Sequence, residues 1–87
     1  MDNNQNPQDG NINIELNEMV AAGVYANLAL VNHSPSEFVV DFIQLMPGVQ
    51  QAKVRSRIIL APIHAKRVMA ALQQNIANYE QQFGEIK

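Results

Sequence analysis

The sequence predicts a small α+β domain in which an antiparallel β-meander of three to four strands is followed by one long C-terminal helix, packed on one sheet face. Two patterns support this fold class. Runs rich in β-branched and aromatic residues, separated by short turn-forming segments, occupy residues 24–60. After Pro62, apolar residues instead recur every three or four positions, the period of an amphipathic helix. A chain of 87 residues is expected to form a single domain.

The N-terminal segment has a different composition from the rest of the chain. Residues 1–10 (MDNNQNPQDG) contain no aliphatic residue after Met1, so we expect a disordered polar tail, and residues 11–87 are expected to form the domain. Ile12, Ile14 and Leu16 then alternate with polar residues, which indicates a short edge strand. Residues 18–23 fit either a connection or a half-turn of helix.

Three longer runs predict the meander. Residues 24–31 end at the turn-forming segment 32–36, and residues 37–46 end at the turn dipeptide Pro47-Gly48. Residues 52–60 alternate apolar and basic side chains through Arg57. These turns place Asp41 opposite Arg57. One face is then almost wholly apolar and forms the predicted core: Phe38, Val40, Phe42, Val54, Ile58 and Leu60, continued by Val24, Ala26, Leu28 and Leu30.

The opposite face, which we call the outer sheet face, has no second helix to cover it. The same register gives it an apolar half beside a basic half: Tyr25, Asn27, Ala29, Val31, Val39, Asp41, Ile43, Leu45, Lys53, Arg55 and Arg57. A solvated sheet face is normally polar, and an exposed apolar patch on a monomer usually marks an interface. We therefore expect Tyr25, Val39, Ile43 and Leu45 to form a homo-oligomer interface, most simply that of a dimer.

The helix is predicted to begin at Pro62, where the missing N–H of proline costs nothing, and to end before Gly84. It would have about 21 residues and a length of about 32 Å. Its apolar stripe is expected to pack on the core face and consists of Ala65, Val68, Met69, Leu72, Ile76, Tyr79 and Phe83. The remaining surface is polar and nearly uncharged. This polarity fits either plain solubility or helix-to-helix pairing in an oligomer, where few charges would have to be desolvated.

Five of the six basic residues fall between positions 53 and 67. Lys53, Arg55, Arg57, Lys66 and Arg67, which we call the basic stripe, are candidates to bind an acidic protein or a nucleic-acid-associated partner. The alternative is a solvated strand face that prevents edge-to-edge aggregation, assisted by Asp41.

Composition argues against catalysis. The chain contains no cysteine and two histidines, and no carboxylate lies near either histidine at a metal-ligand spacing. No nucleophile elbow or phosphate-binding loop occurs. We therefore predict a protein that is not an enzyme, without cofactor, metal or small-molecule substrate. The absence of cysteine and of long apolar runs is typical of a cytoplasmic protein without a membrane segment.

Several segments resemble a known family: residues 23–29 (GVYANLA), 33–38 (HSPSEF), 52–60 (AKVRSRIIL) and 64–67 (HAKR), with Tyr79-Glu80 and Phe83-Gly84. They are similar to short bacterial and archaeal proteins, often of about this length, that are classed only as a domain of unknown function. This resemblance carries no catalytic or ligand residues. It implies a role near the transcription machinery, because genes of such proteins often lie beside those for RNA polymerase and ribosomal proteins.

Two functions follow as hypotheses. The first is a non-enzymatic, homo-oligomeric binding or assembly protein that uses the outer sheet face for self-contact and the basic stripe for its partner. The second rests on topology, since a meander followed by a long helix is similar to the SecB export chaperone. In that case the protein would be a chaperone or holdase module that uses apolar sheet surface.

Overall fold

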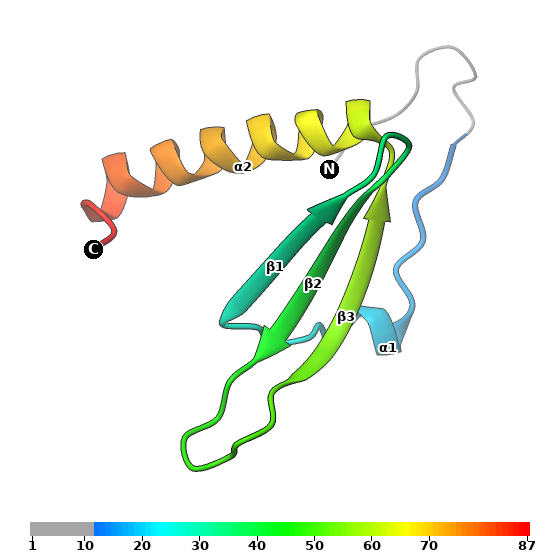
Figure 1. Cartoon of the computed structure of the whole chain (residues 1–87). Helices are drawn as coiled ribbons and strands as arrows, with labels where there is room; N and C mark the ends of the chain where they lie inside the picture. Colours follow the sequence, from blue (N-terminus) through cyan, green and yellow to red (C-terminus); the bar gives the residue numbers. More distant parts are fainter. Residues whose placement is uncertain (1–11) are drawn as a thin grey trace.

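The computed structural model describes residues 12–87, and its elements are α1 (Glu18–Ala21), β1 (Leu28–His33), β2 (Phe38–Gln44), β3 (Lys53–Leu60) and α2 (Pro62–Phe83). The three strands form one antiparallel sheet in the order β1-β2-β3, and α2 follows directly (Figure 1). The predicted α+β meander with a long C-terminal helix is confirmed. The predicted tail over residues 1–10 lies outside the described residues.

The pairing of β2 with β3 places Asp41 opposite Arg57 and Phe42 opposite Ser56, as predicted. The prediction for the first strand is wrong by one residue. Ala29 and Val31 lie opposite Phe42 and Val40, whereas the two leucines predicted for that face lie opposite Ile43 and Asp41. The cause is the first turn. It is tighter than predicted, with the Ser34 N–H bonded to the Glu37 carbonyl at 2.9 Å, so the strand continues through Asn32 and His33.

A β-bulge in β3 also changes which residues of this strand lie on each face of the sheet. The register shifts between Phe42 and Ile43, so Val54 lies opposite Ile43 and Lys53 opposite Gln44, with Arg55 as the extra residue. Val54 therefore shares a face with Ile43, and its predicted place beside Phe42 is wrong. Because Asp41 and Gln44 point to opposite faces of β2, Lys53 and Arg57 also lie on opposite faces of the sheet.

The segment before β1 forms no strand. Ile12, Ile14 and Leu16 are 40%, 66% and 69% exposed and pair with nothing in the sheet, so the predicted edge strand is wrong. Asn17 instead caps α1, accepting a hydrogen bond from the Val20 N–H at 2.9 Å. Asn27, just before β1, is hydrogen-bonded to Leu45, just after the end of β2. Its amide side chain accepts from the Leu45 N–H at 2.7 Å and donates to the Leu45 carbonyl at 3.1 Å.

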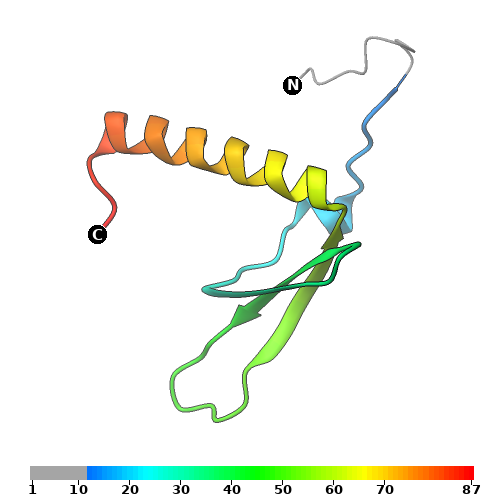
Figure 2. The same ribbon diagram turned by 45° about the horizontal axis from the view of Figure 1, so that its top comes forward.

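Helix α2 has the predicted bounds, with Pro62 at its start and Gly84, at φ 97°, just beyond its end. Its predicted packing is not found: none of its 22 residues is buried, and the helix projects away from the sheet (Figures 1 and 2). The reason lies in the connection to β3, which is the single residue Ala61. One residue spans at most about 3.6 Å, too little to lift a helix the ~10 Å that separates packed layers.

The described residues bury little. Ile43 is the one buried apolar side chain among them, and Asp41 the one buried charged side chain. The radius of gyration is 16.1 Å, against about 12 Å for a compact chain of this length. Within residues 12–87 the chain therefore builds a sheet and a helix without a hydrophobic core between them.

The Asn27 bridge yields the first prediction. Asn27→Ala removes both hydrogen bonds to Leu45 and should lower the free energy of unfolding by about 1 kcal/mol. Urea denaturation at one fixed protein concentration measures the change. Asn32→Ala, an exposed asparagine of β1 opposite Val39, is the matched control and should change stability by less than about 0.5 kcal/mol. If both variants lose the same free energy of unfolding, the hydrogen bonds between Asn27 and Leu45 make no specific contribution to stability.

Candidate binding surfaces

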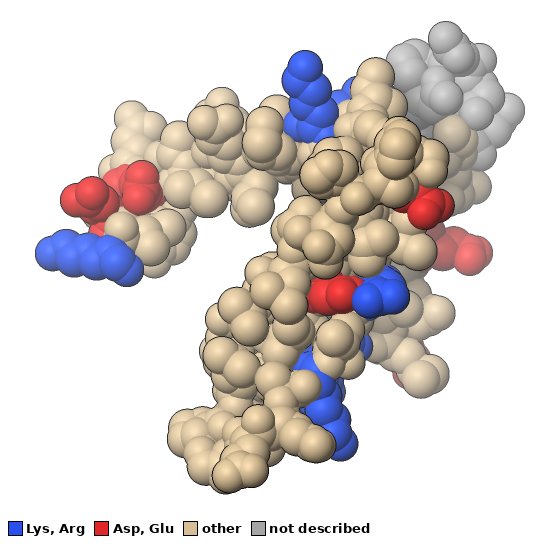
Figure 3. Space-filling view, in the orientation of Figure 1, with Lys and Arg blue, Asp and Glu red and all other residues tan. Residues whose placement is uncertain are grey.

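The basic stripe divides into two separate groups. Lys53 and Arg55 lie at the start of β3, beside the hairpin turn, whereas Lys66 and Arg67 lie early in α2, beyond the other end of that strand. The length of β3 alone separates the groups by about 23 Å. Figure 3 shows basic side chains at both ends of the sheet, with an adjacent acidic and basic pair between them. The structure therefore does not bring the five predicted residues into one continuous site.

Arg57 lies between the two groups, and its guanidinium is paired with Asp41. Its Nε donates to Asp41 Oδ1 at 2.7 Å and its Nη2 to Oδ2 at 2.9 Å, a bidentate pair on cross-strand neighbours. The Asp41 residue is 6% exposed, so the carboxylate depends on this partner. The Arg57 guanidinium therefore stabilises the sheet through this pair, and its charge is already balanced by Asp41.

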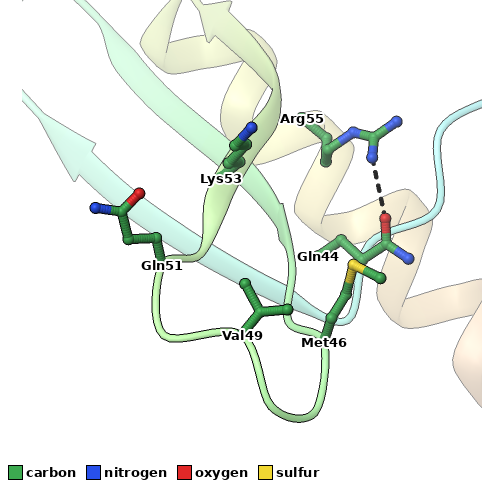
Figure 4. A pocket seen from close by; sticks show the side chains of 6 residues that line it. All are labelled: Gln44, Met46, Val49, Gln51, Lys53 and Arg55. Atoms are coloured by element: carbon green, nitrogen blue, oxygen red, sulfur yellow. Dashed lines mark hydrogen bonds between the residues drawn. The ribbon is translucent and has the colours of Figure 1, made fainter.

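The Lys53 end forms a shallow pocket at the hairpin (Figure 4). The turn closes with the Val49 N–H bonded to the Met46 carbonyl at 3.2 Å, and Gly48 supplies a φ of 79° that other residues rarely adopt. Arg55 donates from Nη1 to Gln44 Oε1 at 3.1 Å, which holds its guanidinium beside the pocket. The lining combines apolar and cationic groups: Gln44, Met46, Val49, Gln51, Lys53 and Arg55. Such a lining suits an acidic side chain flanked by apolar ones.

The predicted oligomer residues of the outer sheet face differ in exposure. Tyr25 is 67% exposed and Leu45 is 48% exposed, and Val39 is half-buried. Ile43 is 5% exposed and so is already covered within the chain. Tyr25 and Leu45 come from neighbouring segments, since Asn27 is bonded to Leu45, but Val39 lies toward the other end of β2.

An exposed apolar surface runs along α2, where the sequence pattern predicted a stripe that packs on the core face. We call Ala65, Met69, Leu72, Ile76, Tyr79 and Phe83 the α2 seam. Its apolar residues beyond Ala65 are between 40% and 66% exposed. Their spacing alternates four and three, which is the seam of a coiled coil, and Val68 of the predicted stripe lies beside this seam. This regular alternation was the signal in the sequence that the core assignment overlooked.

Comparison with known proteins identifies the family of the chain. A family model described as "Protein of unknown function (DUF3467)" matches residues 1–87. The chain belongs to this family. No curated protein and no solved structure matches the chain. Among the described residues, no group of three His, Cys, Asp or Glu side chains could hold a metal ion, and no helix has the length and apolar character to cross a membrane.

The Asp41–Arg57 pair predicts a pH dependence of stability. Hydrogen bonds from Arg57 lower the pKa of Asp41 below its usual value, against the opposing effect of burial. The stabilisation is therefore complete above pH ~4, the pKa of an unfolded aspartate, and is lost as the pH falls through the lower folded pKa. The stability difference between wild type and Asp41→Asn, from urea unfolding between pH 2 and 7, should shrink on acidification. A difference that does not vary with pH would contradict this account.

Proposed function

We propose that this protein is a non-enzymatic, homo-oligomeric binding protein whose hydrophobic core is completed between copies of the chain. The observation that carries the proposal is the exposure of the α2 seam: Leu72 is 59% exposed and Phe83 is 66% exposed. A solvated helix with so much exposed apolar surface is unstable alone, since most helical stability in proteins comes from packing an apolar face. A second copy carries the same apolar surface and is always present.

The exposed area is large enough for a stable dimer. The chain of 9.7 kDa exposes 7901 Å², whereas a compact protein of that mass exposes about 5,100 Å². Residues 1–11 lie outside the described part of the chain, and at most about 1,700 Å² of the excess can belong to a segment of that mass. About 1,000 Å² remains, and a specific interface takes about 800 Å² from each partner.

Two surfaces are available for this self-contact. On the outer sheet face, Tyr25 and Leu45 are exposed and offer a small apolar patch at one end of the sheet. The α2 seam offers a longer one, running along a helix of 22 residues. We assign the main contact to the α2 seam and a secondary one to Tyr25 and Leu45. Val39, at the other end of β2, lies outside this secondary contact, and Ile43 is buried within the chain.

The hairpin end is the proposed site for a different partner. Lys53 and Arg55 lie beside the apolar Met46 and Val49, so an acidic protein surface would gain both charge pairing and apolar contact. Lys66 and Arg67 are too far along the fold to share that contact. An acidic surface of the transcription machinery is our candidate partner. The SecB-like chaperone function would instead require the apolar surface to remain free in the native assembly.

Sedimentation tests the self-association. We expect an oligomer at about 100 μM, a concentration at which a contact of about −5 to −6 kcal/mol is substantially formed. Leu72→Asp places a charge in the α2 seam and should produce monomers, because the carboxylate would have to be desolvated. Gln74→Asp introduces the same residue on the polar side of the helix and should leave the oligomer intact. A wild-type chain that sediments as a monomer would refute the proposal and favour a free apolar surface, as in a chaperone.

Binding of a labelled oligo-glutamate peptide tests the hairpin end. Lys53→Gln with Arg55→Gln should weaken binding about tenfold and reduce its dependence on salt, since two cations of the site are lost. Arg67→Gln with Lys87→Gln removes the same charge elsewhere and should have little effect. If the two double variants bind the peptide equally well, Lys53 and Arg55 are solvated side chains of the strand and form no binding site.

A further inference from the structure

We infer that two copies of the chain pair through α2 in antiparallel orientation, related by a two-fold axis that crosses each helix near Gln74. This inference rests on the proposed homo-oligomer and specifies its contact. It follows from three properties of α2: the spacing of the seam, its symmetry, and the placement of its charges.

The spacing of the α2 seam fits another helix better than a sheet. The intervals from Ala65 to Phe83 alternate four and three without a break, giving a repeat of 3.5 residues per turn. None of the helix is buried within its own chain, and the single residue Ala61 before Pro62 prevents it from folding back. No other part of residues 12–87 covers the seam, and we therefore assign its partner to a second copy of the chain.

The seam is also symmetric about its middle. An antiparallel pair centred near Gln74 places Leu72 opposite Ile76 of the other copy, and Met69 opposite Tyr79. These are pairs of matched apolar character, and a thioether beside an aromatic ring is favourable. At the ends the small Ala65 lies opposite the large Phe83, which leaves room for the ring. A two-fold axis requires this kind of self-complementary surface.

The charges of α2 favour the antiparallel orientation. Lys66, Gln73 and Glu80 follow one another at intervals of seven residues on one flank of the seam. In an antiparallel pair the same flanks face each other, so Lys66 of each copy lies opposite Glu80 of the other, and Gln73 opposite Gln73. In a parallel pair this flank would face Val68, Asn75 and Gln82, which are uncharged.

The same charges are poorly placed for a helix alone. The first turn of α2 contains no acidic residue, the last turn contains no basic residue, and Glu80 lies in the last turn, where the negative end of the helix dipole disfavours it. An antiparallel partner reverses this, since it brings Lys66 and a helix N-terminus to that end. Glu80 Oε2 also accepts a hydrogen bond from the Ile86 N–H at 3.0 Å, which holds its carboxylate near the helix surface.

Disulfide crosslinking tests the orientation, and the chain suits it because it contains no cysteine. Gln73→Cys should crosslink two copies rapidly under mild oxidation, because the two positions face each other near the axis. Gln82→Cys is the matched control. In the antiparallel pair it lies about 24 Å from its copy, about sixteen residues along the helix at 1.5 Å each, and should not crosslink.

Charge exchange provides an independent test. Lys66→Glu and Glu80→Lys should each weaken self-association about tenfold in sedimentation, since two attractive pairs become two repulsive ones. Both changes improve the match between charge and helix dipole, so weaker assembly would not arise from a weaker helix. An equimolar mixture of the two variants should recover wild-type association as a heterodimer, which also shows that both variants fold.

The outcomes separate this inference from the function on which it rests. Crosslinking of Gln73→Cys together with recovery in the mixture supports the antiparallel helix pair. An oligomer in which Gln73→Cys does not crosslink and the charge variants associate normally overturns the pair, and leaves a homo-oligomer built through the sheet. A wild-type monomer overturns both.

Discussion

The connection between β3 and α2 determines the rest of this structure. Ala61 is the only residue between Leu60 and Pro62, and its backbone is extended, at φ −63° and ψ 147°. The following proline disfavours the helical conformation at that position. Strand-to-helix connections normally have two to six residues, which is enough to bring a helix back over its sheet. Without them, α2 continues away from the strand, and the apolar surfaces of helix and sheet cannot cover each other.

That constraint gives the protein an incomplete core and, in our proposal, its function. A compact small domain would have little apolar surface left for self-association, whereas this chain exposes apolar residues along the whole of α2. Pairing through the helices would leave the hairpin, with Lys53 and Arg55, at the far end of the sheet from the helix start. A dimer would then present two separate basic ends to acidic partners. The Asp41–Arg57 pair lies between these regions and holds β2 and β3 in register.

Much of the fold followed from the sequence because its signals are local. The turn at Pro47-Gly48 fixed the pairing of Asp41 with Arg57, and Pro62 and Gly84 marked the ends of α2. The faces of the strands were harder. The bulge at Arg55 and the tighter first turn each change the face on which residues of their own strand lie, and neither has a distinct sequence signature. The failure to predict the site had a different cause. The apolar stripe of α2 was assigned to the core, although its regular spacing and the short connection before it both favour a contact between chains.

Hydrogen exchange of the α2 amides tests the central claim, that this helix is stabilised by another copy of the chain. At about 100 μM protein, where the proposed contact is formed, the amides between Met69 and Tyr79 should be strongly protected, and dilution should weaken that protection as copies separate. An isolated helix of this length is marginal in water and opens readily. Exchange of these amides at the rate of an isolated helix at the high concentration would contradict the account.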